Sequence, residues 1–477
     1  MSESAIEGSS RSRVAIGSVL LVVAAVLRLS GFAHDLWLDE VWALRVATEM
    51  SSPLGVFTLH HEINHHLNTL WLYLVGPNAP LAFYHLPSYL LGVASVGVAG
   101  AIGWRRGEVV GVATMLVFAL SYELVLYSSE ARGYAAVVFF TLLAFLAIES
   151  FAETRRIRWL ALFWCVSVLG LLSHPVYAAF LGALIAQSAW TSYRSTRQVG
   201  PTLREVALVY GIPVGALAVL WLFDLRLVVE GGGTPSASLI DAYGSALAWA
   251  VGTARPAPVQ LLSCIVAVAL LVGGIARTRR EGDDRRVLYW AGVVLFPLLL
   301  VLVRGSNVLY VRHFITAAIF LLLLLGQLLG AWWSDGRRTR AVIAAGAFAA
   351  INLWNVMDLA MHGRGQYRAA IAYMTEQGDG DATITIGSDH DFRVGTELAY
   401  YLPRAETTRR LAFVAQGEWP DNGPTWLILH REANARLTNI APVVEPGPGM
   451  RYRLSRSFPS APLSGLHWFV YRREGGR

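Results

Sequence analysis

Long apolar runs occupy the first three quarters of the chain. Within residues 1–360, hydrophobic stretches alternate with short polar connections. Most of these stretches have the roughly 17–23 residues that a helix needs to cross a hydrocarbon layer. We therefore expect a polytopic α-helical membrane protein with about eleven transmembrane helices, near 14–33, 81–103, 109–126, 133–150, 159–173, 175–192, 205–224, 259–276, 287–303, 308–330 and 341–360.

From residue 361 onward the pattern becomes that of a polar globular sequence. Helix-like stretches alternate with β-branched or alternating ones, which favours a small α/β domain. We expect a transmembrane domain over 1–360 and a soluble α/β domain over 361–477. The transmembrane domain includes an outer loop with interfacial helices at 34–80 and a flexible outer loop at 225–258. The predicted helices lie at 366–375 and 396–401, and the strands at 382–387, 426–430, 451–454 and 468–471.

The charges fix the expected topology. The 477 residues carry a net charge of +6, only 15% are charged, and the mean hydropathy is +0.47. All basic residues are arginines, and many lie in alternate connections between the apolar runs. Such clusters are typical of cytoplasmic loops and do not indicate a nucleic-acid partner. We expect a multi-pass protein of the cell (inner) membrane, with a cytoplasmic N-terminus and a periplasmic or otherwise extracytoplasmic C-terminal domain. Both cysteines lie in apolar runs, where they indicate neither a disulfide nor a metal site.

Ionisable residues at membrane depth are costly and mark function, and here they gather on the predicted outer side. The sequence Trp37-Leu38-Asp39-Glu40 directly follows the first span. Adjacent carboxylates at a membrane surface suit a general base, a metal site or a helix N-terminus. The structural alternative is that Asp39 is the N-cap of an interfacial helix over 40–49. Arg28, inside the first span, is interpreted as snorkelling or as facing a phosphate.

A second motif leaves a different function open. His61-Glu62-Ile63-Asn64-His65 matches the H-E-x-x-H pattern of zinc proteases, in which two histidines on one helical face bind zinc. The sequence identifies no third ligand, so a membrane-embedded zinc metalloprotease is an alternative hypothesis. A lipid or sugar transporter without chemistry is another. It predicts coupling residues near mid-bilayer, whereas the ionisable residues lie at the outer rim.

Two further motifs place arginines at the outer ends of later spans. Glu130-Ala131-Arg132-Gly133-Tyr134 opens the fourth span, and Arg312-His313 opens the tenth. Guanidinium groups bind phosphate with paired hydrogen bonds, which suits a phosphate at the membrane surface. The alternatives are an ion pair that tethers a tight turn and, for Arg312, a snorkelling anchor.

In this order, the motifs resemble those of the GT-C superfamily of glycosyltransferases. The similarity is to the protein O-mannosyltransferase and aminoarabinose transferase-like group, which includes bacterial dolichyl-phosphate-mannose-protein mannosyltransferase-like proteins. The acidic pair matches that family's first outer loop, and residues 130–134 match the second. The late-span motif has His313 where relatives have tyrosine, and 366–370 with 398–403 resemble the bacterial periplasmic domain. The downstream histidine segment is matched by Asn64-His65-His66-Leu67-Asn68-Thr69-Leu70.

The resemblance implies an inverting transfer of a sugar from a polyprenyl-phosphate donor to an acceptor hydroxyl outside the membrane. Asp39 would be the general base, and Glu40 would hold a neighbouring group or sugar hydroxyls. No cofactor is required, and a divalent metal is not predicted, although His61 and His65 would be its alternative ligands. The acceptor is a glycan, a lipid or a protein, and membrane lipids are further partners. The resemblance assigns donor binding to His65, His66, Glu130, Arg132, Tyr134, Arg312 and His313, with Asn64, His174 and Glu230 as further candidates.

Overall fold

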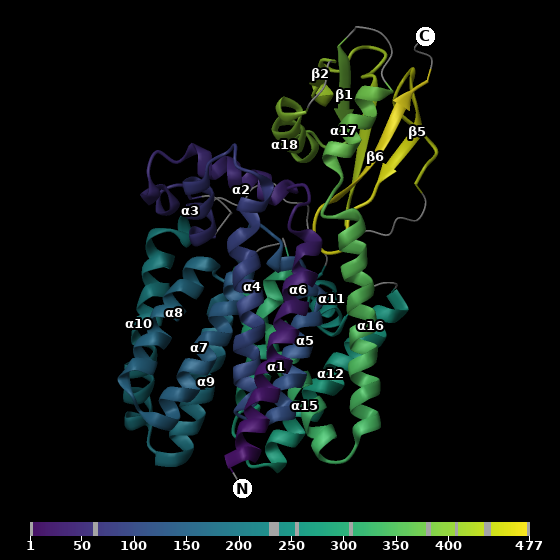
Figure 1. Cartoon of the computed structure of the whole chain (residues 1–477). Coiled ribbons are helices and arrows are strands. Elements are labelled where there is room, and N and C mark those ends of the chain that lie inside the picture. The colour runs from purple at the N-terminus through teal and green to yellow at the C-terminus, as the bar shows by residue number, and fades with distance from the viewer. Residues whose placement is uncertain are drawn as a thin grey trace.

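The protein consists of a helical membrane domain with an α/β domain on one end (Figure 1). A computed structural model describes residues 3–60, 65–228, 238–252, 257–304, 309–377, 383–405, 409–433 and 440–474. Within these ranges, all eleven predicted apolar segments are helical. They correspond to α1 (Glu3–Arg28), α4 (Leu81–Trp104), α5 (Glu108–Leu120) with α6 (Tyr122–Ser128), α7 (Tyr134–Thr154), α8 (Ile157–Ser173), α9 (Tyr177–Thr196), α10 (Val199–Phe223), α12 (Ala257–Arg280), α13 (Arg286–Trp290) with α14 (Phe296–Arg304), α15 (Ile315–Ser334) and α16 (Arg338–His362).

Fewer helices than predicted meet the length and composition of a full membrane span. Among the described residues seven do, and the bent pair α5–α6 makes an eighth. Helix α8 and the apolar segment Arg286–Leu299 are shorter. The apolar sequence of helix α9 is interrupted by polar residues such as Gln187 and Thr191, whose side chains form a hydrogen bond of 3.0 Å. The multi-pass prediction is thus confirmed, while the three remaining segments are helices below the length or hydropathy of a full span.

Helices α5 and α6 meet at a 60° bend next to Ser121. A bend leaves backbone groups without helical partners, and these need other ones inside a membrane. The Arg28 guanidinium donates to the carbonyl of Phe118 at 3.2 Å and to that of Ala119 at 3.4 Å. On the other side of the bend, the Tyr122 N–H donates to Asn352 Oδ1 at 2.7 Å. Arg28 is fully buried, so its interpretation as a snorkelling or phosphate-facing residue is wrong. Its guanidinium instead donates hydrogen bonds to carbonyls that the bend leaves without helical partners.

The arginine-rich connections gather at the end of the bundle that lies away from the α/β domain (Figure 1). Ion pairs join them there, among them Arg106–Glu149 at 2.7 Å, Arg285–Glu149 at 3.2 Å and Arg277–Asp335 at 2.7 Å. This grouping agrees with the alternation of loops that the sequence predicts. That this end faces the cytoplasm stays a prediction from the positive-inside rule.

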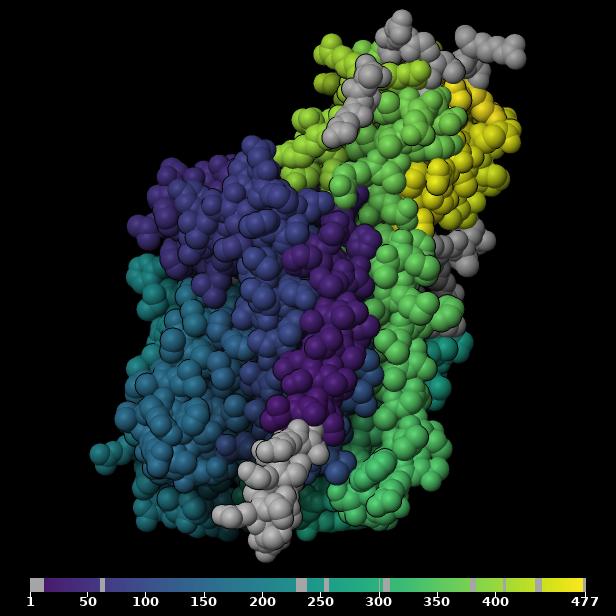
Figure 2. Space-filling view, in the orientation of Figure 1, coloured from purple at the N-terminus to yellow at the C-terminus, as the bar shows by residue number. Residues whose placement is uncertain are grey.

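Short helices cover the opposite end. Helices α2 (Leu38–Glu49) and α3 (His66–Val75) form most of the described part of the first outer loop. The loop predicted to be flexible at 225–258 contains a 13-residue helix, α11 (Leu239–Val251). The helix begins with an N-cap, Ser238, whose hydroxyl accepts the Asp241 N–H at 3.2 Å. Viewed from one side, α1 and α16 run along the surface of the bundle beneath the α/β domain (Figure 2).

The α/β domain follows α16 directly. Its six-stranded sheet has the order β2-β1-β3-β6-β5-β4. Strand β1 pairs in parallel with β2 and β3, and the other pairs are antiparallel. The predicted helices and strands are confirmed, and two short strands, β2 and β4, are additional. The elements are α17 (Tyr367–Glu376), β1 (Ile384–Ser388), α18 (Asp391–Tyr401), β2 (Leu411–Phe413), β3 (Trp426–Glu432), β4 (Val443–Gly447), β5 (Met450–Phe458) and β6 (Leu466–Arg473).

The two domains share a hydrophobic core rather than a polar boundary. Leu44 of α2 and Leu398 of α18 belong to one buried cluster. The connection between β5 and β6, residues 459–465, reaches into the helical domain, where the Tyr122 hydroxyl donates to the Pro462 carbonyl at 2.7 Å. In the same connection, Leu463 has a φ of 72°, a conformation that is strained for a non-glycine residue. The α/β domain is therefore fixed on the end of the bundle where the acidic pair lies.

Candidate active site

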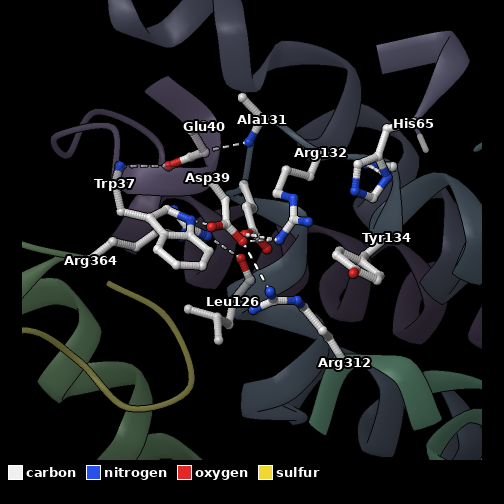
Figure 3. A network of polar contacts seen from close by, with 12 residues as sticks. Trp37, Asp39, Glu40, His65, Leu126, Ala131, Arg132, Tyr134, Arg312 and Arg364 are labelled. Carbon is white, nitrogen blue, oxygen red and sulfur yellow. Dashed lines mark hydrogen bonds and ion pairs between the residues drawn. The ribbon is translucent and has the colours of Figure 1, made fainter. Parts of the chain in front are cut away.

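Asp39 lies at the start of α2, between two arginines from distant parts of the chain. Helix α2 begins at Leu38 with Trp37 as its N-cap, so the alternative that Asp39 caps the helix is wrong. Instead, Asp39 Oδ2 lies 2.8 Å from Nη1 of Arg132 and 3.1 Å from Nη2 of Arg312 (Figure 3). The Asp39 side chain keeps 24% of its surface exposed. It is thus an accessible carboxylate held in a fixed place by two cations.

Glu40 has a different environment from its neighbour. It is fully buried, and its two oxygens accept the N–H of Trp37 at 3.1 Å, the N–H of Ala131 at 2.6 Å and Nε2 of His85 at 2.9 Å. Burial alone raises the pKa of Glu40, but Arg364 and His85 outweigh it, and its pKa lies below the ordinary value. Glu40 therefore ties the start of α2 to the loop that carries Arg132. In this structure it does not line the cleft described below.

The loop that carries Arg132, residues 129–133, is buried, so its backbone groups need protein partners. Asn68 donates to the Ala131 carbonyl at 2.7 Å, and Ser88 donates to the Arg132 carbonyl at 3.1 Å. The Gly133 N–H lies 3.2 Å from Nδ1 of His65. A Cβ at Gly133 would stand 2.1 Å from the Ser173 carbonyl oxygen, so this close approach requires glycine.

Arg364, which sequence reasoning missed, completes this support from the connection between α16 and α17. It is fully buried and donates to the carbonyls of Leu126 and Ser129 at the end of α6, and to the Ser129 hydroxyl at 3.1 Å. Cationic groups at a helix C-terminus stabilise its unpaired carbonyls. The junction between the two domains thus fixes the loop of Arg132.

The two arginines are nearly buried, and each still has an N–H group that can donate to a ligand. Their side chains are 8% and 12% exposed. The Arg132 guanidinium lies over the ring of Tyr134 at 5.1 Å, and that of Arg312 lies over Tyr310 at 3.9 Å and over Trp37 at 5.6 Å. Among the described residues, the buried Nε of each arginine has no hydrogen-bond partner. Buried N–H groups without acceptors are unfavourable, and an anionic ligand would satisfy them.

Glu130 also lies close to these arginines. Its Oε1 accepts the indole N–H of Trp37 at 3.0 Å and lies 3.6 Å from Nη1 of Arg132. The ion pair proposed for this turn is therefore present, because the loop brings together groups that one helix would separate. Burial raises the pKa of Glu130 more than the nearby Arg132 and Arg364 lower it. Glu130 is therefore more readily protonated than an exposed glutamate.

His65, Tyr134 and His174 form an aromatic group beside Arg132 (Figure 3 shows the first two). The ring centres of His65 and His174 are 4.6 Å apart, and each lies about 5 Å from that of Tyr134. Burial and the charge of Arg132 hold the pKa of His65 well below its usual value. A buried histidine beside a cation is expected to favour its neutral form.

His66 and His313 each contact a protein group. His66 Nε2 lies 2.7 Å from Asp224 at the end of α10, and His60 binds the other oxygen of this carboxylate at 3.0 Å. The pair fastens the first outer loop to α10 rather than joining the Asp39 site. The ring nitrogen Nδ1 of His313 accepts the Tyr310 N–H at 3.4 Å.

Several predicted residues lie outside the described part of the chain, namely His61, Glu62, Asn64 and Glu230. The H-E-x-x-H hypothesis therefore cannot be placed as a whole. Its described member, His65, is the N-cap residue of α3 and contacts the loop of Arg132. Within the described ranges, no group of three or more His, Cys, Asp and Glu side chains could hold a metal ion.

A small cleft of about 60 Å³, open on one side, lies beside Asp39 between the helical and the α/β domain. Sequence reasoning missed the contribution of the α/β domain. Its cleft residues are single positions on strands and connections, and they form no motif that can be recognised from their spacing. The cleft is lined by Trp37, Leu38, Asp39, Tyr310, Arg312, Arg393, Glu432, Ala433, Leu463, Ser464, Gly465 and Leu466.

Comparisons place this architecture beside two kinds of solved structure. No family model matches the chain, and no curated protein matches it in sequence. The oligosaccharyltransferase of Archaeoglobus fulgidus, in complex with Zn and sulfate, is 10% identical, with a TM-score of 0.45 over 87% of this chain and 68% of that chain. ArnT of Cupriavidus metallidurans in the apo state is 13% identical, with a TM-score of 0.38 over 97% and 98% of the two chains.

Proposed function

We propose that the protein is a GT-C-type glycosyltransferase that moves a sugar from a polyprenyl-phosphate donor to an acceptor hydroxyl on the extracytoplasmic face of the membrane. One observation carries the proposal. A partly exposed carboxylate, Asp39, stands at the membrane-domain end of a cleft and is held by two arginines that have unpaired buried N–H groups. A base beside a phosphate site is the arrangement that transfer from a phosphosugar needs.

In the proposed reaction, inversion occurs in a single displacement. The acceptor oxygen forms a bond to the anomeric carbon while the bond from that carbon to the phosphate oxygen breaks. The acceptor proton passes to Asp39, and the bonding electron pair leaves with the polyprenyl phosphate. Arg132 and Arg312 stabilise the negative charge that grows on the leaving phosphate. No step requires a metal or a cofactor.

Binding of the donor would also prepare the base. Without a ligand, Asp39 Oδ2 accepts from both arginines. A phosphate is a stronger acceptor for a guanidinium fork than a single carboxylate oxygen. When the donor phosphate takes part of these hydrogen bonds, the carboxylate is released to accept the proton. Glu40, with three hydrogen bonds to protein groups, then acts as a positioning residue for Asp39 and Arg132.

The position of the arginines relative to the membrane indicates the class of donor. The arginines lie at the outer ends of apolar helices, where a bilayer-anchored chain could present a phosphate head group. One of the ArnT structures contains undecaprenyl phosphate, and an archaeal oligosaccharyltransferase structure contains a dolichol-phosphate. The proposal names a lipid carrier of that chemical class, on the strength of the arginine pair.

The test is a transfer assay with a panel of radiolabelled donors. Membranes that contain the full chain, and matched membranes without it, receive polyprenyl phosphates that carry different labelled sugars. We expect one or a few donors to lose their label in a protein-dependent manner, with polyprenyl phosphate as the second product. If no polyprenyl-phosphate sugar is consumed above the level of the matched membranes, the proposed function is wrong.

A further inference from the structure

Asp39 lies between two environments that differ in chemistry. Toward the helical domain, Arg132 and the aromatic group of His65, Tyr134 and His174 are buried. Among the described residues, neither Arg132 nor this group lines the cleft. Toward the α/β domain, the carboxylate faces the open cleft. An inverting displacement needs the leaving group and the acceptor on opposite sides of the anomeric carbon. With the phosphate held by Arg132 and Arg312, the acceptor would approach from the cleft, which Arg312 borders and Arg132 does not.

The α/β domain places a charged pair across the cleft from Asp39. Arg393, near the start of α18, lies 3.1 Å from Oε1 of Glu432 at the end of β3. The Arg393 side chain is 9% exposed, whereas that of Glu432 is 43% exposed. Arg393 Nη1 also lies 3.3 Å from Nε2 of His430, whose Nδ1 lies 2.7 Å from Asp389. The pair is therefore part of a network that holds it in place.

The position of this network in the sheet is one where ligands bind. Strands β1 and β3 are parallel, and Asp389 and Glu432 lie at their carboxyl ends. In α/β domains, ligands bind outside the carboxyl ends of parallel strands. This edge of the sheet faces the membrane domain and contributes Ala433 to the cleft beside Glu432.

The lining of the cleft defines the chemistry of its occupant. Without a donor each charge is matched, Arg393 with Glu432 and Arg312 with Asp39. When the donor phosphate binds Arg312, the acceptor meets the matched pair Arg393–Glu432 and the carboxylate of Asp39. An unpaired charge would favour a ligand of opposite charge, whereas matched pairs offer donors and acceptors side by side to a neutral group. A hydroxyl can accept from a guanidinium and donate to a carboxylate at once. The ring of Trp37 and that of Tyr310 supply apolar faces of the kind that pack against the C–H groups of a sugar.

We propose that this cleft is the acceptor site and that Arg393 and Glu432 bind hydroxyls of a neutral sugar ring on a carbohydrate acceptor. This inference rests on the proposed function and deepens it. One acceptor hydroxyl points to Asp39, loses its proton to that carboxylate and forms the new bond to the anomeric carbon. The leaving phosphate departs on the side of Arg132. The α/β domain thus selects the acceptor, while the helical domain binds the donor.

Two activities separate this inference from the proposed function. Donor consumption with water as the acceptor reports on Asp39 and the arginines, whereas label in a saccharide product reports on the cleft as well. The assay uses the full chain in membranes, the labelled donor that the wild type consumes, and fractionation of products into saccharide, peptide and lipid. The variants are Glu432→Gln and Arg393→Gln, with Arg431→Ala as the matched control. Arg431 is exposed, lies next to Glu432 on β3 and does not line the cleft.

We expect label in the saccharide fraction of the wild type and of Arg431→Ala. In Glu432→Gln and Arg393→Gln, transfer should fall by roughly tenfold to a hundredfold, the effect of losing a hydrogen bond to a charged group. Donor hydrolysis should stay within twofold of the wild type, which also shows that the variants are folded. Label that goes to the peptide or lipid fraction would overturn the inference. Unchanged transfer, or an equal loss of transfer and hydrolysis, would also overturn it.

Discussion

Substitution of Glu40 by glutamine separates a positioning role from a chemical one. Glu40 accepts three hydrogen bonds in a fully buried place. A glutamine oxygen placed at Oε1 keeps the hydrogen bonds with the Ala131 N–H and with His85. The amide NH2 then faces the Trp37 N–H, which loses its acceptor. One buried backbone donor is left without an acceptor, which costs about 1–3 kcal/mol. The variant should therefore fold, with a free energy of unfolding lowered by that amount.

The activity of Glu40→Gln should fall in part, because the start of α2 and the loop of Arg132 lose a charged contact without losing Asp39. Thermal unfolding of the detergent-purified protein and the transfer assay measure the two effects together. Glu49→Gln is the control, since Glu49 lies on the same helix with its side chain 47% exposed. A variant as stable as the wild type but without any transfer would refute this reasoning and would place Glu40 against the substrate.

Three further predictions concern Arg132, Gly133 and Glu397. Arg132→Ala should lower kcat by about 10²–10³, the cost of losing one donor to a developing oxyanion. Substitution of the exposed Arg45 by alanine should leave kcat unchanged. Similar kcat values for the two variants would contradict the role of Arg132 in binding the phosphate. Gly133→Ala should reduce both folding yield and transfer, because its Cβ would meet the Ser173 carbonyl at 2.1 Å; Gly200→Ala, with open space around it, is the control, and equal yields for the two would count against a tightly held loop. Glu397, a fully buried residue of α18, has a pKa that burial raises well above its ordinary value. The folded protein therefore binds more protons than the unfolded chain, and the free energy of unfolding falls as pH rises above about 4.3. Glu397→Gln should flatten this decline in thermal unfolding measured from pH 5 to pH 8, and a decline as steep as in the wild type would contradict the raised pKa of Glu397.

The membrane domain could be predicted from the sequence because its signal is local. A helix that crosses a bilayer needs a long apolar run, and every such run is helical here. What length alone could not supply is the 60° bend between α5 and α6. That bend depends on Arg28 and Asn352, which lie far away in sequence and supply the missing hydrogen bonds.

The centre of the candidate site could be predicted to the same extent. Asp39, Arg132 and Arg312 come together as their places at the outer ends of helices indicate. The fate of His66 could not be foreseen, since its partner Asp224 is a single acidic residue more than 150 positions away. Arg364 and Arg393 were likewise beyond reach, because an isolated arginine gains a role only when the two domains are docked.

The most direct measurement is the turnover of Asp39→Asn with a donor that the wild type has been shown to consume. Asparagine keeps the size of the side chain and can still accept from Arg132 or Arg312, but it cannot take the acceptor proton. The variant should insert and unfold like the wild type while kcat falls by about 10²–10⁴, the contribution of a positioned base. Wild-type turnover by Asp39→Asn would contradict the assignment of Asp39 as the base.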